Sequence, residues 1–546
     1  MQGQDLFSGF FVALLVSMLL VPPLIRLAGR LKLVDEPDSR KIHEENIPRT
    51  GGIAIVLGAL VPLSIWLSFD RQTSFVLAGA AIIVIFGLLD DRNNLNYKWK
   101  FFGQILAVAV AMYGGLMIRY LPFFGIDPVP MYVSIPVTTL FLLGVTNAIN
   151  LSDGLDGLAA GASLITLSAI AWLAYRAGGP QLALLALSVM GGICGFLRYN
   201  NYPAVVFMGD TGSQFLGFLT ASFAVLLTQD LNIALNPALL LLLLGLPILD
   251  TLVVMVWRMR NGRSPFLPDK SHFHHRLLEI GFLHYQAVSM IYLAQAALVA
   301  TAIFVRYQSD VIVLSVYVVF SAIVIGFFRW SRVSEFDPGA GEAGREYERR
   351  NTWLRRVTWL PDVSTRGVAL LIGALLVAAA LYPANVPSSF GAMSGVISLL
   401  LALSLLMPLE WRRTAMRVGV YLASVCAVYS LSMPAAVHHL PAWFLNGWLV
   451  LIGLFIIVAI RVTRRTEFRT TPLDLLILFF VIVVVTSSVY DEVLAQYDAG
   501  SAAIRLALLF YGGEFLYNKG RGYYTPLPVA AFLATAVLAA RGLLIG

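Results

Sequence analysis

Long apolar runs separated by short polar segments extend from one end of the chain to the other. The runs are about 17–23 residues long, enough for a helix to cross ~30 Å of hydrocarbon at ~1.5 Å per residue. The strands of a transmembrane β-barrel alternate and run for only ~10 residues, so that class is excluded. The pattern predicts an all-α polytopic integral membrane protein with about 18 transmembrane helices.

Eleven of the predicted spans lie in residues 1–328, and about seven more lie in residues 366–546. The first group covers 6–27, 51–69, 74–90, 99–120, 132–148, 158–175, 181–198, 212–228, 236–257, 287–305 and 311–328. The second covers 366–382, 391–407, 415–433, 443–460, 473–490, 501–517 and 526–544. Between them, residues 329–365 form a charged segment that we interpret as a cytoplasmic linker with a short helix near 344–359.

Composition and charge agree with this pattern. Hydrophobic residues make up 58% of the chain and charged residues only 13%, against about 25% in soluble domains. With the N-terminus outside, 32 of the 38 Lys and Arg residues fall on the inner side of the membrane. This asymmetry predicts a multi-pass protein of the inner (cytoplasmic) membrane. The net charge of +7 therefore follows from topology and not from nucleic-acid binding.

Five polar stretches interrupt the apolar pattern, and all five fall at inner ends of predicted spans. Carboxylates, amides and histidines are costly near lipid, so five clusters on one face indicate one site at the cytoplasmic surface. The stretches are Asp35–Gly52, Asp90–Lys100, Asn147–Leu158, Pro203–Ser213 and Gly262–Gly281.

The acidic residues of these stretches are the first candidates for chemistry. Asp90 and Asp91 end the third span, where negative charge opposes the helix dipole, so a function is favoured over a solvated helix end. Such a pair can hold Mg²⁺ or accept a proton. Asp210 precedes the eighth span, where helix capping alone is the simpler alternative to metal binding. Hard oxygen ligands favour Mg²⁺, with Mn²⁺ as an alternative.

Amides and acids recur at every third position in the third stretch, at Asn147, Asn150, Asp153 and Asp156. We expect neighbouring members to share a helix face, with Gly154 and Gly157 either allowing the backbone to approach a ligand or breaking the helix.

Histidine and basic residues form two further groups. His272, His274 and His275 could suggest zinc, but Arg263, Lys270 and Arg276 crowd them, so anion recognition is the better interpretation. Lys41, His43 and Arg49 add a second basic group. Acids for a divalent cation together with cationic groups for phosphates are what phosphoryl transfer requires.

The five stretches, in this order, resemble those of the polyprenyl-phosphate N-acetylhexosamine-1-phosphate transferase family, and the resemblance covers residues 1–328. It implies transfer of a sugar-1-phosphate from a UDP-sugar to a polyprenyl phosphate, with release of UMP and a need for Mg²⁺. RSPFLPDKSHFHH is similar to the WecA and TagO branch, which implies UDP-GlcNAc or a related UDP-N-acetylhexosamine as donor. The acceptor implied for a bacterial member is undecaprenyl phosphate.

The resemblance also implies roles for individual residues. Asp90 and Asp91 correspond to catalytic paired acids near the metal, and Asp210 with Asp90 to the metal ligands. Asp153 and Asp156 fall in the catalytic segment that positions nucleotide and metal. Substrate-binding roles fall to Lys41, His43, Asn150, Arg263, His272, His274 and His275.

Several alternatives stay open from the sequence. Direct attack by the lipid phosphate and a two-step route through a phospho-aspartate are both compatible with these residues. A transporter or flippase is the rival class, although such proteins usually place ionisable groups near mid-membrane. Residues 366–546 have no counterpart in the resemblance, and we consider them a further transmembrane domain, or a docking module for a later glycosyltransferase or export protein. A homodimer is a further open expectation.

Overall fold

A computed structural model describes residues 3–35, 46–125, 127–262, 264, 272–333, 360–432, 442–462, 472–490, 498–518 and 526–544. Among these residues, 11 helices are long and apolar enough to cross a membrane. Shorter apolar helices accompany them at Gly51–Trp66, Ser388–Ser404, Trp443–Val458 and Leu476–Val485. The polytopic helical class is confirmed, and the total of about 18 spans stays a prediction.

The chain folds as two compact units, Met1–Ala340 with Thr471–Leu473, and Gly341–Thr470 with Asp474–Gly546. The first contains α1 (Gly3–Leu31), α2 (Gly51–Trp66), α3 (Arg71–Asn93), α4 (Tyr97–Tyr113), α5 (Met131–Leu151), α6 (Leu158–Arg176), α7 (Pro180–Asn200), α8 (Gly209–Val225), α9 (Leu239–Leu243), α10 (Gly245–Arg260), α11 (Phe273–Glu279), α12 (His284–Val305) and α13 (Asp310–Val333). Two-residue strands β1 (Val34–Asp35) and β2 (Ile47–Pro48) pair antiparallel, Val34 opposite Pro48.

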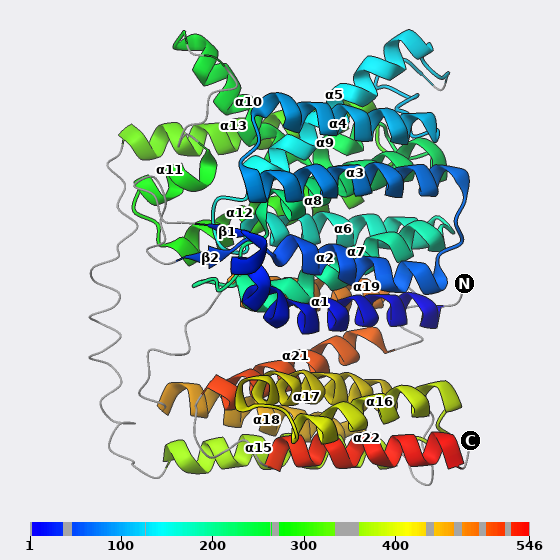
Figure 1. The fold of residues 1–546 in the computed structure, drawn as a ribbon, viewed down its shortest axis with the longest axis vertical. Helices are drawn as coiled ribbons and strands as arrows, with labels where there is room; N and C mark the ends of the chain where they lie inside the picture. Colours follow the sequence, from blue (N-terminus) through cyan, green and yellow to red (C-terminus); the bar gives the residue numbers. More distant parts are fainter. Residues whose placement is uncertain are drawn as a thin grey trace. The chain divides into compact units, whose positions relative to one another are not determined.

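Helix α8 is the centre of the first unit. The most apolar 18-residue stretch within Gly209–Leu231 is wholly buried, whereas only 11% of the corresponding stretch in α13 is buried. Helices α2, α3, α5 and α6 pack around α8, and Figure 1 shows them running roughly parallel, with β1, β2 and α11 near a common end. Residues at the start of α8 are therefore held by several neighbouring helices at once.

The turn between α3 and α4 places two helix ends side by side. Asn94 adopts the left-handed conformation (φ 47°), which Asn tolerates, and its N–H closes the end of α3 on the carbonyl of Asp90. Asn96 then caps α4 by accepting from Lys98 N–H at 3.4 Å. This short turn brings the end of α3, with its two acids, next to Lys100 in the first turn of α4.

One predicted span is wrong as a continuous helix. The sequence predicts a single span over 236–257, but the structure breaks it at Leu244, between α9 and α10. The freed carbonyl of Leu243 accepts hydrogen bonds from Gln295 Nε2 at 2.8 Å and Thr166 Oγ1 at 2.9 Å. Neighbouring side chains thus satisfy backbone groups that a water-free environment would leave unpaired, and apolar periodicity alone gives no signal of this.

The described helices of the second unit are α15 (Leu360–Leu381), α16 (Ser388–Ser404), α17 (Leu409–Leu431), α18 (Ala442–Val462), α19 (Pro472–Tyr490), α21 (Ala499–Asn518) and α22 (Pro526–Leu544). Helix α22 packs against α15, α16 and α17. The helix predicted near 344–359 lies outside the described residues.

Candidate active site

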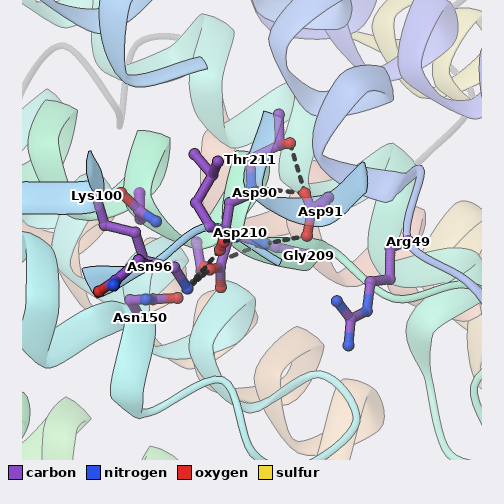
Figure 2. A network of polar contacts seen from close by, with 12 residues as sticks. Arg49, Asp90, Asp91, Asn96, Lys100, Asn150, Gly209, Asp210 and Thr211 are labelled. Atoms are coloured by element: carbon purple, nitrogen blue, oxygen red, sulfur yellow. Dashed lines mark hydrogen bonds and ion pairs between the residues drawn. The ribbon is translucent and has the colours of Figure 1, made fainter. Parts of the chain in front are cut away.

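Three carboxylates and one ammonium group meet where α3, α4 and α8 come together. Asp90 and Asp91 are 4% and 5% exposed at the end of α3, and Asp210 begins α8. Lys100 Nζ forms an ion pair with Asp90 and lies 2.7 Å from Asp210 Oδ2. Figure 2 shows the Lys100 side chain reaching between these two carboxylates, while Asp91 turns toward Thr211. The structure therefore joins the second and fourth polar stretches.

Asp91 caps the start of α8. Its Oδ1 accepts from Asp210 N–H at 2.9 Å, and its Oδ2 accepts from Thr211 N–H at 2.9 Å and the Thr211 hydroxyl at 2.6 Å. Gly209 makes this approach possible, because its φ is +70° and a Cβ there would lie 2.6 Å from Asp91 Oδ2. Both Asp91 oxygens are thus occupied in positioning the start of α8, the helix that carries Asp210.

The third stretch does not form one helix face. Helix α5 ends at Leu151, so Asn147 and Asn150 are helical while Asp153 and Asp156 lie in the loop before α6. The expectation of a shared face is wrong for the two acids, because α5 ends at Leu151, with Ser152 as its C-cap, before Asp153 is reached. Asn150 Oδ1 accepts from the Ser213 hydroxyl at 2.6 Å, which links the end of α5 to α8.

Asp153 is electrostatically part of the carboxylate cluster. Burial, followed by the negative charges of Asp210, Asp91 and Asp156, raises the pKa of Asp153 to about 8. Both causes disfavour the ionised carboxylate, so Asp153 holds its proton more tightly than an exposed Asp does.

Asp156 fastens its own loop to its surroundings. Its Oδ2 accepts from Ala204 N–H at 2.9 Å, and its backbone N–H donates to His284 Nε2 at 3.2 Å. The next residue, Gly157, donates its N–H to Asn200 Oδ1 at 2.8 Å. The loop that carries Asp153 is therefore anchored on the segment leading to α8.

The histidine motif reaches the same loop through His274. This residue is 2% exposed, and its Nε2 has no hydrogen-bond partner among the described residues. A Cβ on Gly154 would lie 2.2 Å from that nitrogen, so the motif packs directly on the residue after Asp153. Burial, then the neighbouring His275 and His272, lowers the pKa of His274 well below its ordinary value. His275 lies against His274, with ring centroids 4.2 Å apart.

Two features of the site were missed in the sequence. Asp250 of α10 lies with Oδ2 3.0 Å from Nδ1 of His272, and its signal was a single acid within the apolar segment LPILDTLVV. Gln104 bonds to Gln214 at 3.0 Å and to Asn147 at 2.8 Å, one helical turn from Lys100 and Asp210. The available signal was two glutamines, each four residues after a charged residue. Lys41, His43 and Arg263 lie outside the described residues.

The carboxylates suit a divalent cation by their chemistry. Asp90 and Asp210 share the ammonium of Lys100, and Asp153, whose pKa burial raises to about 8, is a further oxygen donor beside them. Among the described residues, no group of three His, Cys, Asp or Glu side chains forms a ready metal site. Mg²⁺ commonly uses only one or two carboxylates together with substrate phosphates, so the residues present fit Mg²⁺ bound with a nucleotide donor.

Comparisons with known proteins place this geometry in context. Residues 73–228 match the model of glycosyl transferase family 4. A probable undecaprenyl-phosphate N-acetylglucosaminyl 1-phosphate transferase of Bacillus subtilis (strain 168) is 37% identical over 318 residues, which cover 58% of this chain and 88% of that protein. Decaprenyl-phosphate N-acetylglucosaminephosphotransferase of Mycobacterium leprae (strain TN) is 37% identical, over 49% of this chain and 75% of its own length. An undecaprenyl-phosphate alpha-N-acetylglucosaminyl 1-phosphate transferase of Escherichia coli (strain K12) is 31% identical, over 52% of this chain and 79% of its own length.

Proposed function

This chain belongs to the polyprenyl-phosphate N-acetylhexosamine-1-phosphate transferases of glycosyl transferase family 4, and we propose that it transfers N-acetylglucosamine-1-phosphate to polyprenyl phosphate. The donor is a UDP-sugar, UMP is released, and the product is a lipid-pyrophosphate-linked sugar that starts a cell-surface glycan. The relatives are named as transferases and lend no support to the transport alternative.

The observation that carries the proposal is the meeting of Asp90, Asp210 and Lys100 at adjoining helix ends. Transfer of a phosphoryl group needs little covalent help from the protein, but it needs charge neutralisation and alignment of the two reacting phosphates. A cation bound by the two carboxylates would supply the charge neutralisation and the alignment at one point. The site also lies at helix ends, where a lipid phosphate and a soluble donor can both reach it.

The residues divide the work as follows in this proposal. Asp90 and Asp210 would hold Mg²⁺, and Asp153 would help to balance its charge. When bound, Mg²⁺ would neutralise the donor pyrophosphate. Lys100 holds the acceptor phosphate against the donor's β-phosphorus, and the acceptor is already largely ionised near neutral pH. Asp91 acts by fixing the start of α8, since both its oxygens are occupied by Asp210 and Thr211.

The distribution of charge supports an orientation with this site on the cytoplasmic face. The polar stretches fall on the side that receives 32 of the 38 Lys and Arg residues when the N-terminus is outside. Donor nucleotides are then available from the same compartment. For residues 366–546 we propose a docking role toward a later glycosyltransferase or export protein.

The test is transfer of radiolabel from UDP-GlcNAc to undecaprenyl phosphate by the purified full-length chain in detergent. We expect labelled lipid with Mg²⁺ and none after chelation. Asp210→Asn, prepared in the same way, controls for a contaminating activity. Labelled product with a different UDP-N-acetylhexosamine would change the donor and keep the reaction. No product with any of these donors would refute the proposal.

A further inference from the structure

The histidine motif is fastened to α10 by a carboxylate that lies outside all five polar stretches. Asp250 is 5% exposed, and its Oδ2 lies 3.0 Å from Nδ1 of His272, which is 4% exposed. Its Oδ1 accepts from Phe273 N–H at 2.9 Å. One carboxylate therefore holds both the ring of His272 and the first backbone N–H of α11.

This contact decides which ring nitrogen of His272 carries hydrogen. An ionised carboxylate only accepts hydrogen bonds, so Nδ1 is the protonated nitrogen and Nε2 is the one left for other partners. Rotation of the ring is restricted as well, because His272 stacks parallel to His274, with centroids 5.9 Å apart and an interplanar angle of 5°. The direction and the hydrogen-bonding character of Nε2 are both set by Asp250.

The motif held in this way belongs to the carboxylate site. His274, two residues along, packs against Gly154, and the adjacent Asp153 feels the charges of Asp210 and Asp91. A UDP-sugar whose pyrophosphate lies at the acids would therefore be near histidines whose orientation is fixed. Hydrogen-bonding groups that must meet a substrate gain most from such pre-organisation.

We propose that Asp250 is a positioning residue for sugar-phosphate transfer. It keeps His272 in the Nδ1–H form, so that Nε2 stays free to accept a hydrogen bond from a hydroxyl or N–H group of the UDP-sugar donor. The inference rests on the proposed function. It requires no new covalent step, since His272 only accepts a hydrogen bond and neither accepts nor transfers the phosphoryl group.

A purely structural role for Asp250, as the cap of α11, makes a different prediction. In Asp250→Asn the amide oxygen can still accept from Phe273 N–H, so the cap is kept. The amide NH₂ then faces Nδ1 of His272 and favours the opposite tautomer, with hydrogen on Nε2 and no carboxylate charge behind the ring. This substitution keeps the cap of α11 and removes the control that Asp250 has over the tautomer of His272.

Full-length wild type, Asp250→Asn and the control Glu279→Gln are compared in nanodiscs. Glu279 is an exposed acid at the end of α11, the short helix that carries His274, so it tests loss of charge without loss of the contact. We expect Asp250→Asn to lower kcat/KM for the UDP-sugar about 100-fold, because Nε2 changes from an acceptor to a donor, with an unchanged KM for polyprenyl phosphate. Glu279→Gln should behave as wild type, and the thermal midpoints of all three should agree closely.

A spectroscopic measurement reports on the contact without relying on turnover. In ¹⁵N-histidine-labelled protein, the His272 resonances are identified by their loss in His272→Gln. We expect a protonated Nδ1 in wild type and a protonated Nε2 in Asp250→Asn. Wild-type kinetics for Asp250→Asn, or an unchanged tautomer, would overturn the inference. An inactive wild type with the expected tautomer change would instead refute the proposed function and retain the Asp250–His272 coupling.

Discussion

In the first unit, carboxylates gather at one place, whereas in the second unit each described ion pair joins one acid to one base. Burial, followed by the negative charges of Asp210, Asp91 and Asp156, raises the pKa of Asp153 to about 8. In the second unit, Arg417 of α17 pairs with Glu514 of α21 at 3.0 Å.

This difference indicates which charges are there for stability and which are there for function. A paired Arg and Glu between helices satisfy each other, and the Tyr421 hydroxyl adds a further hydrogen bond to Glu514. Like charges crowded at helix ends raise the free energy of the folded state unless a ligand neutralises them. The comparison therefore predicts large effects on transfer from substitutions in the first unit, and effects on stability alone from those in the second.

The largest expected effect comes from Asp210→Asn. Removal of this carboxylate should lower the transfer rate at least about 1,000-fold, because it would remove a metal ligand and one partner of Lys100. Radiolabelled transfer measures the rate, and size-exclusion chromatography in detergent measures the folded fraction. Glu514→Gln, which removes one carboxylate from the second unit, is the matched control. Near-full Mg²⁺-dependent turnover by Asp210→Asn would show that the metal assignment is wrong.

Lys100→Met should have the next largest effect. The substitution keeps much of the side-chain volume and removes the ammonium that pairs with Asp90 and Asp210. We expect transfer to fall about 100-fold, mainly through a higher KM for polyprenyl phosphate. Lys98→Met on the neighbouring exposed turn is the control, since Lys98 contributes only its backbone N–H to the cap of α4. Equal losses in the two variants would argue against a specific role for Lys100.

Asp91→Asn should have a smaller effect, because Asp91 acts through the start of α8. An amide can replace only part of the three hydrogen bonds that Asp210 and Thr211 donate to this carboxylate. Loss of a helix cap costs about 1 kcal/mol, and we expect about a tenfold slower transfer with a lower thermal midpoint. Thr211→Val, which removes only the hydroxyl contact, should also lower the transfer rate and the thermal midpoint, but by less. A folded Asp91→Asn variant as inactive as Asp210→Asn would instead assign Asp91 to the chemistry.

The thermal midpoint of metal-free protein should depend on pH through the crowded acids. The pKa of Asp153 is about 8 in the folded protein and 3.8 as its ordinary value. Within that window the folded state retains a proton that the unfolded chain releases, so the free energy of unfolding falls as pH rises. With a chelator present, we expect the midpoint to drop by a few °C between about pH 6 and about pH 9. Millimolar Mg²⁺ should reduce the drop, and Asp153→Asn should reduce it without metal. A thermal midpoint of wild type that does not change with pH would contradict the raised pKa of Asp153.

The sequence predicted the membrane class and the meeting of the acidic stretches because those features depend on composition and on helix direction. Apolar length locates a helix, and alternation of loops places Asp90 and Asp210 on one side. It did not predict the break at Leu244, which depends on Gln295 and Thr166 from distant helices. Nor did it find the Asp250–His272 contact, since a pairing between a helix and a loop leaves no periodic signal.

The smallest expected effect on transfer comes from the ion pair of the second unit. Arg417 also lies over the Tyr517 ring, 5.2 Å from its centroid, so the guanidinium stabilises both an acid and an aromatic face. Arg417→Met and Glu514→Gln, singly and together, form a double-mutant cycle followed by SDS unfolding. We expect a coupling of about 1 kcal/mol, in line with polar contacts between membrane helices, while the transfer rate stays within about twofold of wild type. A large loss of transfer in folded single variants would mean that the second unit takes part in the reaction, because a pair that serves stability alone has no route to the chemistry once folding is intact.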